Sequence, residues 1–191
     1  QSLIFSGLET LAFNINRQQS DLKLFEFGKT YHDFDDQKEE FNHLSILITG
    51  NKTEKRWNSK KTEVGYFYLK GLVTGIFDSL GIKKFKSLPL SNDIFSEGQQ
   101  LSVGKHSLVE FGSLKTNALN TFGISQNVFC ANFNWNNLLK VINQNTIKFK
   151  DISKYPEVKR DLSLLIDEDI TFEKLYKLAK QSENNYLKDI N

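Results

Sequence analysis

Residues 153–167 read SKYPEVKRDLSLLID, and this stretch decides how the chain is organised. The eight residues from Lys154 to Asp161 hold three cations, two anions and a proline. Pro156 fixes its own φ angle and restricts Tyr155 to extended backbone. The alternating apolar residues of 162–166 then predict a β-strand with one apolar face. We therefore expect a rigid, basic loop that leads into the first strand of a small domain.

The composition is that of an ordinary globular protein. The chain has 191 residues, of which 39% are hydrophobic and 25% charged, and its formal net charge is +2. This length corresponds to one large domain or two small ones, and so small a charge does not by itself indicate nucleic-acid binding. There is no run of 18 or more apolar residues, so the sequence predicts no membrane span. No basic-then-apolar signal peptide opens the chain. Its first residue is Gln1 and not a start methionine, so we expect a piece of a longer protein.

Upstream of residue 145, the hydrophobic periodicity predicts helices and groups of antiparallel strands. We expect helices at residues 3–16, 67–80, 115–121 and 135–142, and strands at residues 22–31, 43–49, 101–103, 108–112 and 127–133. Helix 67–80 has the clearest pattern, and Gly81 is placed to end it. No βαβ array and no internal repeat is visible. This is the pattern of an α+β protein, with one domain over residues 1–145 and a second over residues 146–191.

The second domain is predicted to contain few elements. A new alternating segment begins at 147–149 and leads into the strand at 162–166. A helix follows, with Thr171 as its N-cap and an apolar face made by Phe172, Leu175 and Leu178. Residues 186–190 are expected to begin a further strand.

Two features of the predicted elements concern packing. Three aromatic residues of strand 22–31 share one face: Phe25, Phe27 and Tyr31. We expect both faces of this strand to be partly covered. Gly71 and Gly75 lie four residues apart on helix 67–80, where each costs about 1 kcal/mol relative to alanine. Either another backbone packs closely against them, or the pair is tolerated.

Few residue patterns indicate catalysis. His32, His43 and His106 lack the spacing of metal ligands, so we expect surface or strand-end positions. Cys130 lies in an apolar run and is expected to be a buried structural thiol. The acidic residues of 33–40 are expected to form a solvated loop. The sequence contains no phosphate-binding loop, dinucleotide fingerprint or nucleophile elbow, so the residues themselves indicate no catalytic centre and no metal site.

The cations of the opening stretch allow two interpretations. Lys154, Lys159 and Arg160 could contact phosphates, while Tyr155 could stack on a base. Alternatively, the segment is a solvated loop in which Arg160 or Asp161 ties the strand to its neighbours. The residues alone leave both interpretations open.

Several segments, in the right order, resemble one family. Residues 153–156 together with 159–163 resemble the opening signature of the ferredoxin-fold anticodon-binding domain that ends the beta subunit of bacterial phenylalanyl-tRNA synthetase. Upstream, Asn14–Arg17 and Leu24–Lys29 together resemble the family's N-x-N-R…L-F-E-x-G element. Gly50, Trp57 and Tyr66–Gly71 resemble its G…W…D-F-F-x-L-K-G element. Phe111–Leu114 falls where the family has a G-x-x-x-P turn, here without the proline. On these residues the chain is identified as a member of this family, a C-terminal fragment of the subunit.

The resemblance implies a fold for each part. Residues before 145 should adopt the fold of a class II synthetase, an antiparallel sheet with flanking helices. Residues from 146 should form the first half of the anticodon-binding domain, a partial β-α-β piece of a ferredoxin-like fold. The family's next segment, F-D-x-Y-x-G, does not occur before Asn191.

The resemblance also implies that this part of the subunit is not catalytic. A working class II site needs one arginine on strand 22–31 and another at the start of the helix after strand 127–134, because guanidinium grips phosphate with two hydrogen bonds and stacks on adenine. The arginines of the chain are Arg17, Arg56 and Arg160. Glu26 remains, but a lone carboxylate cannot bind ATP. We expect no cofactor here, and ATP and magnesium to be used by the holoenzyme.

The partners implied by the resemblance are a catalytic alpha subunit and tRNA(Phe). The holoenzyme would be a cytoplasmic alpha2-beta2 heterotetramer that attaches phenylalanine to its tRNA. The predicted subunit interface on helix 67–80 consists of Leu69, Gly71, Leu72, Gly75 and Ile76. The predicted tRNA contacts are Lys154, Tyr155, Lys159 and Arg160. The alternatives are a functional class II active site, or a stand-alone RNA-binding or protein-interaction protein.

Overall fold

The computed structural model describes residues 2–34, 37–53, 62–142, 154–183, 185–188 and 190. The chain divides into two compact units, Gln1–Lys148 and Phe149–Asn191, which are considered separately. The predicted domain boundary at 145/146 lies outside the described residues, as do the segment at 147–149, Arg56 and Trp57. No helix in the described part of the chain is long and apolar enough to cross a membrane.

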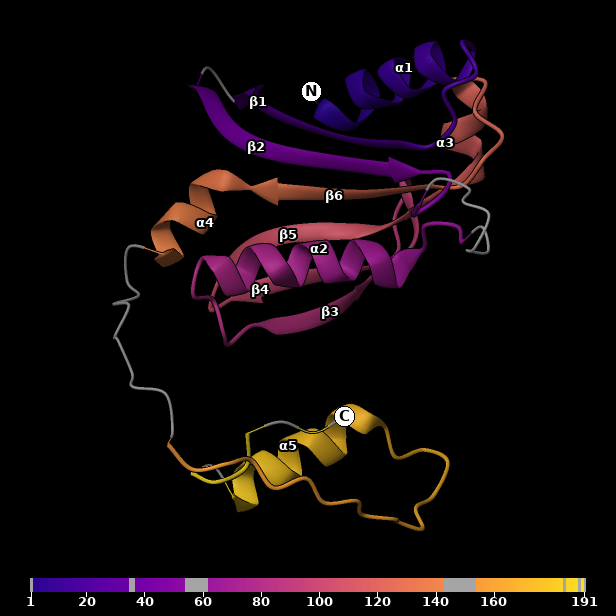
Figure 1. Ribbon diagram of the computed structural model, residues 1–191. Coiled ribbons are helices and arrows are strands. Elements are labelled where there is room, and N and C mark those ends of the chain that lie inside the picture. The colour runs from indigo at the N-terminus through magenta and orange to yellow at the C-terminus, as the bar shows by residue number, and fades with distance from the viewer. Residues whose placement is uncertain are drawn as a thin grey trace. The chain divides into compact units, whose positions relative to one another are not determined.

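The first unit is built on one six-stranded sheet with the order β1-β2-β6-β5-β4-β3 (Figure 1). All neighbouring strands are antiparallel. The strands are β1 (Leu22–Phe34), β2 (Gln37–Thr49), β3 (Lys86–Leu90), β4 (Phe95–Val103), β5 (His106–Leu114) and β6 (Val128–Asn134). The helices are α1 (Leu3–Ile15), α2 (Tyr66–Ser79), α3 (Thr116–Thr121) and α4 (Trp135–Ile142). Each helix and strand predicted for this unit is present, but β2 and β4 begin six residues earlier than predicted.

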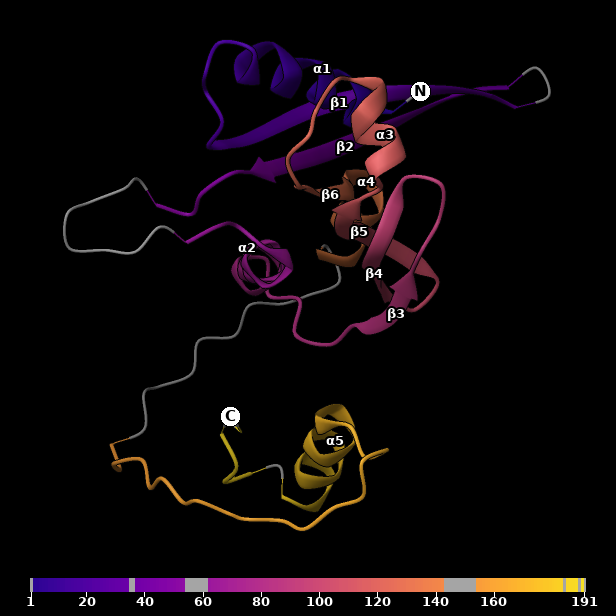
Figure 2. The same cartoon turned by 90° about the vertical axis from the view of Figure 1, so that its right-hand side faces the viewer.

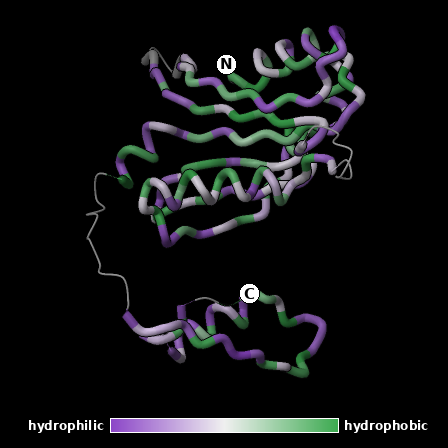
Figure 3. Tube along the Cα trace, viewed as in Figure 1, coloured by the Kyte–Doolittle hydropathy of each residue, from purple (hydrophilic) through white to green (hydrophobic). Residues whose placement is uncertain are grey.

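Helices cover both faces of the sheet. On one face, Leu69, Val73 and Phe77 of α2 are fully buried and pack in one cluster with Phe111 and Phe133. Burial of such side chains contributes about 1.5–3 kcal/mol each. On the other face, a second cluster contains apolar residues of α1 and α3 together with Leu47 and Cys130. Figure 2 shows α2 to one side of β4 and β5, and Figure 3 shows hydrophobic residues recurring along the strands.

Helix α2 has the ends that its sequence predicts. Its buried residues recur every four positions, which is the spacing of one helical face. Gly81 adopts a φ of 72°, and the N–H of Ile82 donates to the carbonyl of Phe77 at 2.8 Å. This left-handed residue ends the helix without the steric cost that a side chain would bring.

Two predictions about local structure are wrong. Glu39 and Glu40 lie in β2 rather than in a solvated loop, because β1 and β2 stay paired as far as Phe34 and Gln37. The segment Phe111–Leu114 is part of β5 and not a turn. Its Gly112 is needed there because a side chain would collide with the backbone oxygen of Glu97 on β4.

The two glycines of α2 have open space around them. A methyl group built on Gly71 or Gly75 would meet no described atom within 4 Å. Within the described part of the chain no other backbone packs closely against them. This pair of glycines is therefore not explained by packing within the first unit.

The second unit contains the predicted helix, α5 (Phe172–Ser182), directly after Thr171. The Thr171 side chain makes no capping hydrogen bond, but its carbonyl accepts from the N–H of Lys174 at 3.0 Å. The predicted strand at 162–166 is wrong, and Leu162 and Leu164 are 80% and 55% exposed. Residues 186–188 are not in a strand either. A strand requires hydrogen-bonded neighbours, and the described residues of this unit include no other strand.

Glycine substitutions in the first unit should have opposite effects. Gly50 has a φ of 78°, and a side chain there would collide with the backbone oxygen of Ser20. We expect Gly50→Ala to lower the free energy of unfolding by about 2 kcal/mol. Gly71→Ala should instead raise it by about 0.5–1 kcal/mol, because alanine is the better helix former and meets no obstacle. Urea unfolding of both variants measures these changes. A loss of stability in Gly71→Ala would contradict the finding that there is open space around Gly71.

Candidate subunit-docking and nucleic-acid interfaces

Strand β1 carries no cation at the position where a class II site would hold phosphate. Leu24 is half-buried in the α1 cluster, and Phe25 is 74% exposed on the opposite face. Glu26 is exposed and accepts a hydrogen bond from the hydroxyl of Ser6 at 3.3 Å. Arg17 lies just after α1, with its guanidinium 3.4 Å from the ring centroid of Phe13. The described part of β1 therefore offers no guanidinium to a nucleotide.

The start of α4 is made of asparagines that hold the sheet together. Asn134 accepts from the N–H of Asn137 at 3.0 Å, and Asn137 donates through its side-chain amide to the carbonyl of Ser107 at 3.0 Å. Asn136 accepts from the N–H of Asn42 on β2 at 2.7 Å. Neutral amides thus tie β2 and β5 to the junction of β6 and α4. The spacing of these asparagines gave no sign of this role.

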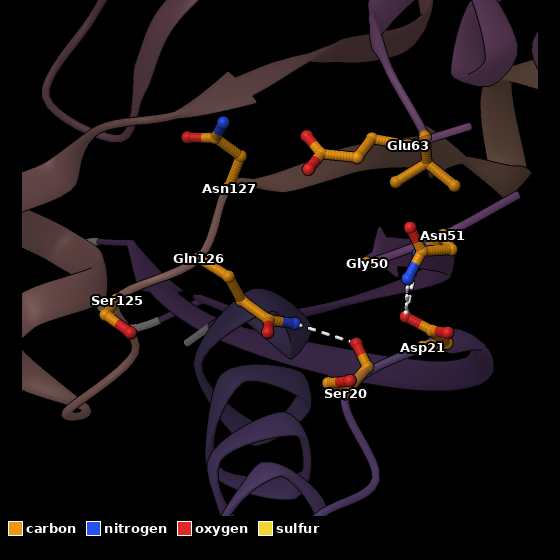
Figure 4. Close-up of a pocket in the computed structure, with 9 residues that line it drawn as sticks. Ser20, Asp21, Gly50, Asn51, Glu63, Ser125, Gln126 and Asn127 are labelled. Carbon is orange, nitrogen blue, oxygen red and sulfur yellow. Dashed lines mark hydrogen bonds between the residues drawn. The ribbon is translucent and has the colours of Figure 1, made fainter. Parts of the chain in front are cut away.

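A polar pocket of about 260 Å³ lies where β1 and β6 begin and β2 ends (Figure 4). The carboxylate of Asp21 accepts two hydrogen bonds from Asn51, from its N–H at 2.8 Å and its side-chain amide at 2.6 Å. Gln126 donates to the Ser20 carbonyl at 2.9 Å and to the Thr49 hydroxyl at 2.7 Å. In Figure 4 the amide nitrogen of Asn51 points to Asp21. The network fixes the ends of three strands, and sequence reasoning missed it because its hydrogen-bonded partners are 30 to 106 residues apart.

An apolar groove of about 320 Å³ lies between α2 and the β1–β2 hairpin. Its lining is Lys23, Leu24, Phe25, Phe27, Leu44, Ile46, Ile48, Tyr68, Leu72 and Ile76. Phe25 and Phe27 are 74% and 57% exposed, so the predicted cover on this face of β1 is absent from the described structure. Strand alternation places these two rings on the same side as α2, away from α1.

The predicted interface residues of α2 occupy different depths. Leu72 and Ile76 are half-buried and line the apolar groove, and Gly71 and Gly75 are exposed. Leu69 is fully buried in the core of the first unit, so its placement on a docking surface is wrong. The reason is that Leu69 belongs to the buried stripe of the helix, together with Val73 and Phe77.

The predicted tRNA contacts lie together in the second unit. Lys154, Tyr155, Lys159 and Arg160 are all exposed, Tyr155 by 84%. Within the same segment, Glu157 forms an ion pair with Lys188 at 2.6 Å. One of the two acids of this stretch is thereby neutralised, and three cations are presented to solvent within seven residues.

The titratable groups of the first unit lie in structural positions. His43 is half-buried within β2, opposite Gly28 and Asn134, so its predicted surface or strand-end position is wrong. Burial lowers the pKa of this imidazole below its ordinary value. Cys130 is fully buried as predicted, and burial raises the pKa of its thiol to about 12. Among the described residues, no cluster of histidine, cysteine and acidic side chains could hold a metal ion.

Comparisons with known proteins agree with this architecture. Residues 1–135 match the family described as the phenylalanyl tRNA synthetase beta chain CLM domain, and residues 153–191 match the ferredoxin-fold anticodon binding domain. The first unit also shares its fold with the pyrrolysyl-tRNA synthetase of Desulfitobacterium hafniense, with a TM-score of 0.53 at 18% identity over 72% of this chain and 47% of that one. The fold is thus that of an aminoacyl-tRNA synthetase, as the resemblance implied.

The relatives define the family more closely. The phenylalanine–tRNA ligase beta subunit of Bacteroides fragilis is 36% identical over 203 residues, covering 100% of this chain and 25% of its own length. The beta subunit of Fusobacterium nucleatum is 34% identical over 94% of this chain and 23% of its own length. The chain belongs to the phenylalanyl-tRNA synthetase beta chain family. It spans about a quarter of the length of these relatives.

The buried thiol should be inert in the native protein and should affect alkaline stability. The unfolded chain ionises Cys130 near its ordinary pKa of about 9, whereas the native thiol stays protonated until about pH 12. The native state then holds the extra proton, so this group lowers the free energy of unfolding as pH rises from about 9 to about 12.

Iodoacetamide labelling at pH 8.5 reports the burial of this thiol directly, because Cys130 is the one cysteine of the chain. We expect no labelling of the native chain and rapid labelling in urea. A Cys130→Ala variant should lose the corresponding part of the alkaline destabilisation. Equal labelling rates in the native and unfolded states would contradict the burial.

Proposed function

We propose that this chain is part of the beta subunit of a phenylalanine–tRNA ligase, where it serves as a non-catalytic scaffold and contributes a contact to tRNA. The proposal is supported by the two family matches and by relatives that carry that name over the whole length of this chain. The observation that carries it is a synthetase sheet whose β1 strand presents Leu24, Phe25 and Glu26 where phosphate would have to be held.

The reason for assigning no catalysis is electrostatic. Attack of the amino-acid carboxylate on the α-phosphate of ATP, which releases pyrophosphate, requires that negative charge on phosphate be stabilised by donors held in place before the reaction. The described arginines are Arg17, beside α1, and Arg160, in the second unit. ATP and magnesium would accordingly be bound by the alpha subunit of a cytoplasmic alpha2-beta2 assembly, which joins phenylalanine to tRNA(Phe).

The scaffold role is assigned to the outer surface of α2. Gly71 and Gly75 leave the helix backbone bare, so a partner could approach it closely. Leu72 and Ile76 lie beside them and are only partly buried. Leu69 supports this surface from beneath through its burial in the core.

The tRNA contact is assigned to the basic segment of the second unit. Ammonium and guanidinium groups that neutralise phosphates supply most of the sequence-independent affinity for nucleic acid. Tyr155 adds an exposed aromatic face on which a base can stack. Lys154, Lys159 and Arg160 lie within seven residues of each other, so they would act on neighbouring phosphates.

The non-catalytic assignment predicts that the chain does not bind ATP. Calorimetric titration of the 191-residue chain with ATP and magnesium should show no saturable binding, whereas the assembled ligase should bind in the same assay. Saturable binding by the chain would overturn the assignment. Loss of that binding in Glu26→Gln would then place a nucleotide on β1.

Charge reversal in the basic segment should weaken tRNA binding. For the double variant Lys154→Glu, Lys159→Glu in the complete ligase, we expect roughly a tenfold or greater rise in the dissociation constant and a salt dependence that falls by about one unit of slope per lost phosphate contact. The matched control is Lys83→Glu, Lys84→Glu, two exposed lysines of the first unit. Filter binding at several salt concentrations measures both effects. Unchanged affinity would refute the contact. Equal losses of affinity in both variants would show that net charge, and not this segment, determines binding.

A further inference from the structure

The polar pocket at the ends of β1, β2 and β6 contains a buried acceptor to which no described residue donates. Asn51 is 7% exposed, and its side-chain oxygen has no hydrogen-bond partner in the described part of the chain. Its amide orientation is fixed, because the amide nitrogen donates to the Oδ1 atom of Asp21 at 2.6 Å. Figure 4 accordingly shows the oxygen of Asn51 on the side away from Asp21. Since buried polar groups are nearly always hydrogen-bonded, this oxygen indicates that the pocket receives a donor.

A carboxylate lies beside this oxygen. Asn51 and Glu63 face each other in an isolated antiparallel bridge. The N–H groups on either side of the pair, of Val64 and Lys52, donate across the bridge at 2.9 and 2.8 Å. This arrangement defines a non-hydrogen-bonded pair, in which the two facing side chains lie closest together. Both side chains line the pocket, so an amide oxygen and a carboxylate meet there as two acceptors.

The pocket is electronegative. Asp21 and Glu63 line it, and none of its described lining residues is a lysine, an arginine or a histidine. Two nearby ammonium groups are held elsewhere, since the Nζ atoms of Lys23 and Lys52 lie 5.6 and 5.5 Å from the ring centroid of Tyr68. A ligand that complements the pocket is therefore a cation.

The acceptors of the pocket suit an organic cation better than a metal ion. Mg²⁺ and Ca²⁺ are held by about six or more oxygen ligands, whereas the described lining includes two carboxylates. A guanidinium group instead carries five N–H donors in one plane, and it is more weakly hydrated than an ammonium group. The cavity of about 260 Å³ lies just below the range of drug-sized ligands, so its ligand is a small molecule or a single side chain.

We infer that the polar pocket binds an organic cation of the guanidinium class. One N–H group would donate to the side-chain oxygen of Asn51, and others to the carboxylates of Glu63 and Asp21. On Asp21 the acceptor would be Oδ2, because both bonds from Asn51 reach Oδ1. The guanidinium belongs either to a free molecule or to an arginine of another protein segment, and the experiment separates these sources. The inference uses only residues of this pocket and does not depend on the proposed function.

The experiment compares two monovalent cations that differ in their N–H donors. The 191-residue chain is titrated with methylguanidinium, and the side-chain amide signals of Asn51 and Gln126 are followed by NMR. We expect saturable shifts of both signals. Tetramethylammonium carries the same charge without an N–H group, and at equal ionic strength it should produce none. Absence of saturation with methylguanidinium, or equal shifts with both cations, would overturn the inference.

A matched pair of variants tests the carboxylate of the pocket. Glu63→Gln removes the charge and keeps the size, so we expect the dissociation constant for methylguanidinium to rise at least about tenfold, because charge-assisted hydrogen bonds are the stronger ones. Glu97→Gln makes the same charge change at an exposed position of β4 that does not line the pocket. It should leave the dissociation constant within about twofold, because distant exposed charges are screened. Thermal melting checks that both variants are folded. Wild-type affinity in folded Glu63→Gln would overturn the inference.

Two further measurements identify the ligand and its source. Displacement of methylguanidinium by magnesium at constant ionic strength would make the pocket a metal site and overturn the inference. The complete beta subunit is then titrated in the same way. Binding there as in the 191-residue chain would show that the pocket takes a free molecule. Binding by the chain but not by the complete subunit would show that an arginine of another segment supplies the guanidinium.

Discussion

The pairing of β2 with β6 is the interaction on which the first unit depends. It joins residues 43–49 to residues 128–134, so an N-terminal hairpin and a later group of four strands become one sheet. Such long-range pairing is favourable only when the side chains on both faces are buried together, because the loop that it closes is costly in entropy. The apolar clusters that include Ile48 and Phe133 on one face, and Leu47 and Cys130 on the other, supply that burial.

The same pairing places every candidate surface of the first unit. The groove lies where α2 rests against one face of the sheet and leaves the outer hairpin uncovered. The polar pocket lies where the ends of β1, β2 and β6 converge. The asparagines at the start of α4 hold this junction with neutral hydrogen bonds in the region where a working synthetase would hold phosphate with guanidinium. The sheet can form without an arginine in β1, because packing depends on apolar side chains whereas phosphate binding depends on placed charge.

Elements with strong local patterns could be predicted closely. Helix α2 followed from the stripe that includes Leu69 and Phe77, and its end followed from Gly81, because both signals lie within one or two turns of the helix. The strands around Cys130 and the buried state of its thiol followed from an apolar run. By contrast, the strand at 162–166 was not formed, because alternation specifies a face but cannot supply the neighbouring strand that makes the hydrogen bonds.

The sequence by itself determined the family, the lack of an arginine in β1 and the composition of the basic segment, because these depend on which residues are present. Only the tertiary structure decided which surfaces are open. Leu69 and Leu72 are the same residue type three positions apart on one helix, yet one is sealed in the core and the other borders the groove. Lys23 and Lys52 are distant in sequence and meet at one ring, that of Tyr68. Exposure and convergence depend on how elements pack, and packing is set by contacts between residues that the linear order keeps apart.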